Sequence, residues 1–183
     1  MNTKELQNKS KYLSLLLRHK PENENLNIDE YGWVPIHEIL DALKIYPHEL
    51  SHIVEFNDKK RFICDEGLTK IRATQGHSFP VKKLIEPLDP PLNLYHGTSI
   101  ENQENIYKNG ITKMNRQDVH LSEDKETAIS VGMRHAKRGD KLWVCTISSK
   151  LMNFDGYLFY KTENGVWLTD HVPTKYIING GNG

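Results

Sequence analysis

The chain has 183 residues, of which 37% are hydrophobic and 26% charged, and its net charge at pH 7 is zero. This composition predicts a soluble globular protein with one large domain or two small ones. The balanced charge excludes tight, nonspecific binding to long nucleic acid duplexes, so any nucleic acid contact must use a local basic patch. No apolar run approaches the ~20 residues that span a bilayer, so we expect a cytoplasmic protein without membrane contact.

The first half of the sequence shows apolar residues at helical spacing, followed by two short β-like runs. The expected elements are helices over residues 4–18, 35–43 and 47–56, an extended segment over 26–34, and strands over 61–64 and 69–73. The tripeptide Asp65-Glu66-Gly67 is typical of a hairpin turn between those strands. Helices followed by a hairpin indicate a winged-helix module, in which basic hairpin residues often meet phosphates.

Four prolines between Gly76 and Pro91 mark the expected boundary between two domains, because Pro90-Pro91 favours an extended linker. We assign residues 1–79 to a first lobe, 80–91 to a Pro-rich linker and 92–183 to a second lobe. In the second lobe we expect helices over 100–109 and 123–138 and strands over 92–95, 141–148, 156–161, 166–168 and 176–178. Ser122 is the expected N-cap of the second helix, and Gly139 follows its end.

Polar residues after the first strand of the second lobe suggest a ligand site. The strand is expected to stop at His96, with Gly97 letting the backbone approach a ligand and Thr98 supplying a hydroxyl. Neither a Gly-x-Gly-x-x-Gly nor a Walker sequence is present, which argues against a Rossmann dehydrogenase or a P-loop nucleotidase. Cys64 and Cys145 form no zinc pattern and are expected to be reduced core cysteines.

Five segments carry a more specific signal through their order and spacing. They are Leu16-Leu17-Arg18-His19, Ile71-Arg72-Ala73-Thr74-Gln75-Gly76-His77-Ser78, Tyr95-His96-Gly97-Thr98, Val119-His120-Leu121-Ser122 and Val131-Gly132-Met133-Arg134-His135. Together with Asn164-Gly165-Val166-Trp167-Leu168-Thr169-Asp170, they resemble the RNA 2′-phosphotransferases, NAD-using enzymes of the ADP-ribosyltransferase superfamily. The resemblance covers roughly residues 9 to 178.

The resemblance implies an α+β fold, with an N-terminal winged-helix-like RNA lobe and an ADP-ribosyltransferase-like lobe of two small β-sheets with helices. It also implies a two-step reaction. An internal RNA 2′-phosphate, as left at a tRNA splice junction, attacks C1″ of NAD and releases nicotinamide. The ribose 2″-hydroxyl then attacks the phosphorus, which yields RNA with a 2′-hydroxyl and ADP-ribose 1″,2″-cyclic phosphate. The expected partners are 2′-phosphorylated RNA, in particular tRNA, and NAD as co-substrate, with no metal, and the protein is expected to be a monomer.

The resemblance also assigns roles to individual residues. The family's catalytic Arg-His-Arg-Arg set matches Arg18, His19, Arg72 and Arg134, and guanidinium groups suit a phosphate because they bind it with two hydrogen bonds. Since Arg134 alone lies in the second lobe, the phosphate pocket is expected to use both lobes. The NAD site matches His96, Gly97, Thr98, His120 and Ser122, and Val166 takes the position where many protein-modifying relatives have a catalytic glutamate.

Plain structural roles remain open for several of these residues. Arg18 and His19 could cap a helix, His77 could cap a turn, and Arg134 and His135 could lie on a plain surface. The three tryptophans, Trp33, Trp143 and Trp167, are expected in the core rather than as platforms on which bases stack.

Two other functions compete with the first. An ADP-ribosyltransferase acting on protein or on a terminal nucleic acid phosphate would require a glutamate in the last strands, yet Glu163 lies in an apparent turn. It would also leave Arg18 and Arg72 without a role. A winged-helix nucleic-acid binder that senses NAD would require a base-reading helix, yet residues 47–56 contain no arginine or lysine. Both features favour the phosphotransferase.

Overall fold

The structure is a computed structural model, and it describes all residues except 1–2, 58–59, 136–139 and 183. The chain divides into two compact units, Met1–Leu84 and Ile85–Gly183, which we describe separately. The division falls inside the Pro-rich segment that we assigned as a linker. Within the described parts of the chain, no helix is both long and apolar enough to cross a membrane. Helices and small antiparallel sheets make up the protein, so the predicted α+β class is confirmed.

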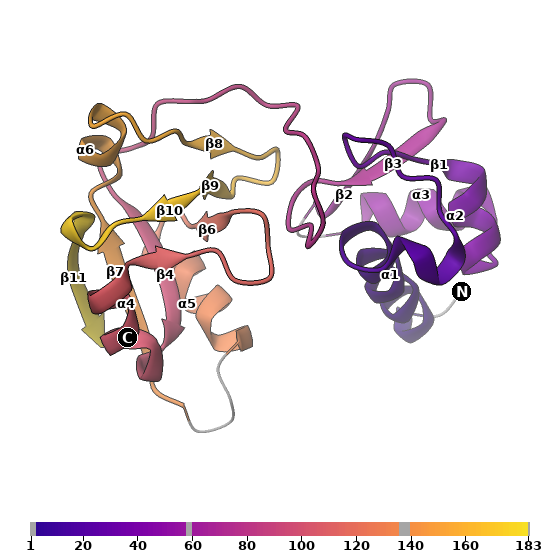
Figure 1. The fold of residues 1–183 in the computed structure, drawn as a ribbon. Helices are drawn as coiled ribbons and strands as arrows, with labels where there is room; N and C mark the ends of the chain where they lie inside the picture. The colour runs from indigo at the N-terminus through magenta and orange to yellow at the C-terminus, as the bar shows by residue number, and fades with distance from the viewer. Residues whose placement is uncertain (1–2, 58–59, 136–139, 183) are drawn as a thin grey trace. The chain divides into compact units, whose positions relative to one another are not determined.

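The first unit packs helices against a small sheet (Figure 1). Its helical elements are α1 (Thr3–Arg18), the 3-10 helix η1 (Pro21–Glu24), α2 (Ile36–Leu43) and α3 (Pro47–Glu55). Leu13, Leu16 and Leu17 of α1 are fully buried. Their 3–4-residue spacing puts them on one face of the helix, where they join the buried residues of α2 and α3 in a single core. The three predicted helices are therefore confirmed.

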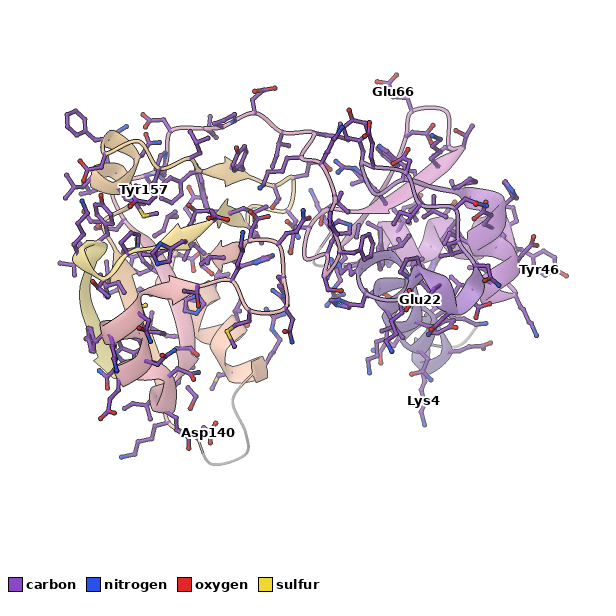
Figure 2. All side chains as sticks on the ribbon, viewed as in Figure 1. Lys4, Glu22, Tyr46, Glu66, Asp140 and Tyr157 are labelled. Carbon is purple, nitrogen blue, oxygen red and sulfur yellow. The ribbon has the colours of Figure 1, made fainter. Side chains whose placement is uncertain are left out.

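The sheet of this unit has the strand order β1-β3-β2, with β1 (Val34–Pro35), β2 (Phe62–Cys64) and β3 (Lys70–Ala73) all antiparallel. The predicted hairpin turn between β2 and β3 is confirmed, since the Leu68 amide donates to the Asp65 carbonyl and Glu66 projects from the tip (Figure 2). The extended segment predicted over residues 26–34 is wrong. Only Val34 belongs to a strand, because Asp29 folds the preceding residues into a turn with its carboxylate.

The second unit contains short strands and helices in alternation (Figure 1). Its strands are β4 (Leu94–Ser99), β5 (Ile111–Thr112), β6 (Val119–Leu121), β7 (Leu142–Ile147), β8 (Tyr160–Lys161), β9 (Trp167–Thr169), β10 (His171–Val172) and β11 (Ile177–Asn182). Its helical elements are η2 (Ile100–Asn102), α4 (Gln103–Asn109), α5 (Lys125–His135), α6 (Ser149–Phe154) and η3 (Thr174–Tyr176). Two three-stranded sheets, β11-β7-β4 and β6-β9-β8, are accompanied by the pair β10-β5.

The core of the second unit lies along β7. Trp143, Cys145 and Ile147 alternate with more exposed residues on this strand and are completely buried, as expected for one face of a sheet. Trp167 of β9 joins the same core, so the core prediction for Trp143 and Trp167 is confirmed. Both cysteines carry free thiols, with Cys145 buried and Cys64 partly buried.

Several expected boundaries in the second unit were wrong. The strand β4 does not stop at His96 but continues through Ser99, because β7 pairs with it along its whole length. The cap of α5 is Asp124 rather than Ser122, since the Asp124 carboxylate accepts from the Thr127 amide at 2.7 Å. Residues 136–138 of the predicted helix, and Gly139 after it, lie outside the described residues. The helix α6 was not predicted, and the strand predicted over 156–161 is reduced to β8.

Candidate active site

A cationic site in the first unit begins with Arg18, the last residue of α1. The helix ends there because the segment after β3 takes over its hydrogen bonds: the Ser78 amide donates to the Arg18 carbonyl at 2.8 Å. The arginine side chain then passes over Gly76, whose φ is +91°. A Cβ at Gly76 would lie 3.7 Å from Arg18 Cδ and 3.8 Å from Nη1. The segment Gly76–Ser78 therefore cradles Arg18 and directs its guanidinium group.

Arg72 is held by an aromatic side chain rather than by a glycine segment. It lies on β3 with only 8% of its surface exposed. Its guanidinium carbon sits 5.0 Å from the centre of the Trp33 ring, a cation–π contact. Trp33 follows the Asp29 turn, in which the Asp29 carboxylate accepts from the amides of Tyr31 at 3.0 Å and Trp33 at 2.9 Å. The prediction that Trp33 is a core residue was thus wrong, because the ring is only partly buried and stacks on Arg72.

His77 shows that these groups lie together. It is 5% exposed, and burial together with the charges of Arg18, Arg72 and His19, in that order, lowers the pKa of its imidazole to about 4. Such effects require nearby charges, so the structure gathers three of the four predicted catalytic residues around one buried histidine. At neutral pH this histidine is uncharged. The alternative in which His77 caps a turn has no support from its Nε2 atom, which makes no hydrogen bond to the described residues.

The second unit brings the motif strands β4 and β6 together. Tyr95 and Ser122 form an isolated bridge in which each amide donates to the other's carbonyl, at 2.9 Å and 2.8 Å. Beside the bridge, His96 Nδ1 lies 3.2 Å from the His120 carbonyl, and His120 Nδ1 lies 3.0 Å from the Asp118 carbonyl. Since a carbonyl only accepts, each Nδ1 carries a proton, which fixes the orientation of both rings. The bridge therefore joins the two three-stranded sheets at the predicted NAD residues.

Val166 reaches the same end of the second sheet. In the antiparallel pairing of β6 with β9, Leu121 is opposite Trp167. Ser122 directly follows β6 and Val166 directly precedes β9, so these two residues lie at the same end of the pair. Thr162, which is 5% exposed, holds the turn before β9: its hydroxyl lies 2.9 Å from the Val166 carbonyl and accepts from the Val166 amide at 3.0 Å. His96, Ser122 and Val166, which are far apart in the sequence, thus belong to one junction of strands.

Gly97 has a packing role that the sequence did not indicate. A Cβ there would lie 2.0 Å from the Ala128 carbonyl oxygen of α5, so the residue lets the helix pack closely against β4. Its assignment to the NAD site stays a prediction. Gly132 faces it from the helix, where a Cβ would be 3.1 Å from the Thr98 amide nitrogen. This glycine contact brings α5 directly onto β4 (Figure 1). It therefore sets the position of Arg134, two residues further along α5, relative to His96 and Thr98.

Sequence reasoning missed two polar residues of the second unit. Asn102 Nδ2 donates to the Thr98 hydroxyl oxygen at 2.8 Å, which directs the hydroxyl proton away from Asn102. Arg116, in the segment between β5 and β6, lies close to Arg134: partial desolvation and the Arg134 charge lower the pKa of Arg116. Arg134 is exposed, so these two guanidinium groups form a second positive feature, on the unit that carries the predicted NAD residues.

In the described residues, a metal ion could be held by three or more histidine, cysteine or acidic side chains that lie close together. No group of three histidine, cysteine or acidic side chains converges there in a way that could hold an ion. In the first unit, Arg18, His19 and Arg72 lie close together and can neutralise an anion. The arrangement there suits a phosphate, because arginine offers several N–H donors in a fixed plane.

Comparison with known proteins agrees with these features. Residues 4–171 match the family described as RNA 2′-phosphotransferase, Tpt1 / KptA family. A probable RNA 2′-phosphotransferase of Flavobacterium johnsoniae is 48% identical over 173 residues, which cover 92% of this chain and 93% of the relative. Proteins with the same description from Acaryochloris marina and Fusobacterium nucleatum are each 45% identical, over 92% and 91% of this chain and 94% of each relative. The chain therefore belongs to the Tpt1 / KptA family of RNA 2′-phosphotransferases.

Proposed function

We propose that this protein removes an internal 2′-phosphate from RNA, in particular from a tRNA splice junction, and transfers it to NAD in two steps. In the first step the phosphate attacks C1″ of the NAD ribose, nicotinamide leaves, and the RNA phosphate becomes ADP-ribosylated. In the second step the ribose 2″-hydroxyl attacks the phosphorus. The RNA leaves with a 2′-hydroxyl, and the other product is ADP-ribose 1″,2″-cyclic phosphate.

The observation that carries this proposal is the convergence of Arg18, His19 and Arg72 around His77. A 2′-phosphate is a dianion near neutral pH, and its transfer requires cations that neutralise charge on the non-bridging oxygens. Arg72 is suited to this task because Trp33 and β3 hold it rigidly, and a bidentate contact requires a fixed guanidinium plane. His19, which is exposed, is placed to reach substrate and to protonate the departing 2′-oxygen.

The residues of the β4–β6 junction fit an NAD site. NAD supplies the electrophilic C1″ carbon and a pyridinium leaving group, which needs positioning more than acid catalysis. The ring of His96 is oriented by the His120 carbonyl, and the Thr98 hydroxyl by Asn102, so both can present fixed polar groups to the ribose and the amide. Val166 offers no base at the end of this junction. A base is unnecessary there because a phosphate nucleophile is already deprotonated.

The direct test is incubation of the protein with NAD and a synthetic oligonucleotide that carries one internal 2′-phosphate. We expect release of nicotinamide, a 2′-hydroxyl oligonucleotide and ADP-ribose 1″,2″-cyclic phosphate, identified by mass spectrometry and ³¹P NMR. An oligonucleotide of the same sequence without the phosphate, and a reaction without NAD, serve as controls. Release of inorganic phosphate without NAD would refute the proposal, as would an ADP-ribosylated oligonucleotide that never proceeds to the cyclic product.

A further inference from the structure

His77 is a buried polar side chain to which the proposed reaction gives no role. Its surface is 5% exposed, and its Nε2 atom has no hydrogen-bond partner among the residues that the structure describes. A buried polar atom without a partner costs free energy, and most native structures contain few of them. A phenylalanine or leucine would fill such a space without this cost. The imidazole therefore calls for an explanation in terms of its neighbours.

The neighbours of His77 are the segments that hold the two arginines. On one side, a Cβ at Gly32 would lie 3.2 Å from His77 Nε2 and 3.3 Å from Val81 Cγ1, so the Asp29 turn closes tightly over the ring. The next residue of that turn is Trp33, on which Arg72 stacks. On the other side, the residues before and after His77 are Gly76 and Ser78, which cradle Arg18. His77 thus lies between the supports of both guanidinium groups.

Within the described part of the chain, the charges that shift the pKa of His77 are positive. The groups that act on its titration are Arg18 and His19 at the end of α1 and Arg72 on β3, and the Asp29 turn meets the ring through the uncharged Gly32. A neutral imidazole lets two arginines and a histidine gather in a small volume without adding a fourth charge. It also keeps a polar, polarisable ring beside them, which a hydrocarbon side chain would not provide.

Resting on the proposed function, we propose that His77 is a positioning residue of the phosphate site. It is the uncharged spacer that holds Arg18 and Arg72 at the separation that one phosphate dianion needs, and it senses whether that anion is bound. The bound dianion offsets the three positive charges that disfavour protonation of the ring. His77 then accepts a proton more readily in the complex than in the free protein.

The first experiment measures this linkage without NAD and without turnover. The His77 Cε1–H signal of the full chain, labelled with ¹³C-histidine, is followed by NMR as a function of pH, alone, with sulfate as a dianion probe, and with a 2′-phosphorylated dinucleotide. Burial and the three cations set its midpoint at about 4 in the free protein. We expect each anion to raise this midpoint by about one pH unit, because a nearby opposite charge has an effect of at least that order on a pKa. A midpoint that neither anion moves would overturn the proposal.

The internal control is the signal of His37, an exposed residue of α2, which sulfate should leave unchanged. A change at His37 as large as that at His77 would indicate a nonspecific effect of salt and would count against the proposal. The outcomes also separate this inference from the function it rests on. Turnover with an unresponsive His77 overturns the positioning role alone. A responsive His77 in a protein without turnover supports the phosphate site and rejects the proposed reaction.

The second experiment uses the variants His77→Phe and His37→Phe, compared in steady-state kinetics. Displacement of a positioned group by ~1 Å can cost about 10²-fold, so we expect His77→Phe to lower kcat/KM for the phosphorylated RNA by up to that factor. The KM for NAD should stay within about twofold, and His37→Phe should match the wild type. A general loss of structure would instead impair both substrates. Equal losses for RNA and NAD, or none, would contradict the proposal, and the NMR measurement on the unsubstituted chain applies even if His77→Phe does not fold.

Discussion

The cationic site of residues 1–84 and the strand junction of residues 85–183 hold their side chains in different ways. Arg18 and Arg72 are long and flexible, and other side chains or glycines support them: Gly76 under Arg18 and Trp33 against Arg72. In the junction, backbone pairing fixes the positions of the site residues. The Tyr95–Ser122 bridge and the register of β6 with β9 place His96, Ser122 and Val166.

The difference predicts where each site is sensitive to substitution. In the strand junction, we expect substitution of an outlying side chain to have a small effect, and substitution of Gly97, where α5 packs on β4, to have a large one. In the cationic site, we expect substitution of a supporting ring such as Trp33 or His77 to lower activity while the fold persists.

Arg72→Ala and His19→Ala should slow the second step of the proposed reaction more than the first. In the second step, charge builds on the non-bridging oxygens, and loss of one donor there typically costs about 10²–10³ in rate. Proton donation by His19 to the departing oxygen adds a factor on the order of 10²–10⁴. A gel time course with labelled 2′-phosphorylated RNA and NAD should therefore show the ADP-ribosylated RNA accumulating.

The matched variant for this prediction is His96→Ala, in the strand junction. It should weaken the use of NAD and accumulate no intermediate. If both cationic-site variants consume substrate slowly without any intermediate, Arg72 and His19 do not act in the second transition state.

Gly97→Ala should destabilise the second unit, because its Cβ would lie 2.0 Å from a backbone oxygen of α5. Helix and strand must separate, and overpacking of this kind costs about 1–3 kcal/mol, with the upper end expected for a clash with backbone. Chemical denaturation with tryptophan fluorescence measures the change. The control is Gly67→Ala, where the nearest atom is 3.5 Å from the new Cβ. Equal stabilities of the two variants would contradict the tight helix–strand contact.

The stability of the protein should fall as the pH drops, and His77 should account for part of the fall. Its folded-state pKa of about 4 lies below the ordinary value of 6.5, so the unfolded chain binds the proton first. The contribution of neutral His77 is complete above pH 6.5 and is lost progressively between 6.5 and about 4, with a total of about 3 kcal/mol. Between pH 6.5 and about 4, the free energy of unfolding of the wild type should therefore fall more steeply than that of His77→Phe, as measured by chemical denaturation at each pH. Equal pH dependence of the two proteins would show that His77 does not titrate there.

Asn102→Ala should have a modest effect that is confined to NAD. The lost hydrogen bond orients the Thr98 hydroxyl, and such bonds contribute about 0.5–1.5 kcal/mol, which corresponds to at most about a tenfold rise in the KM for NAD. Asn105→Ala is the control, because Asn105 contacts Asn109 within α4. A larger effect on the KM for RNA than on the KM for NAD would show that Asn102 does not belong to the NAD site.

Removal of divalent metal should change nothing. The cationic side chains of the phosphate site supply the charge that a metal would otherwise supply, and the sequence offers no spaced ligand set. Turnover in excess EDTA should equal turnover without it. A large loss that magnesium restores would refute this expectation.

Much of the fold follows from local sequence signals. The apolar spacing of α1, α2 and α3 predicts these helices because one buried face suffices to define them. The turn residues Asp65-Glu66-Gly67 predict the hairpin because its geometry is set within a few residues. The boundaries that failed depend on distant partners. The strand β4 continues past His96 because β7 pairs with its whole length, and the sequence of residues 94–99 does not predict this pairing.

For the site, the motifs of the sequence and their resemblance to a family pointed to a set of residues: Arg18, His19, Arg72, Arg134, His96, Gly97, Thr98, His120, Ser122 and Val166. How these side chains are held follows from the folded structure. It placed Trp33 against Arg72 instead of in the core, and it showed that Gly97 lets α5 pack closely against β4. It also buried His77 among three positive charges. The physical reason is that burial, cation–π contact and close backbone approach are relations between segments distant in the chain, which no local pattern encodes.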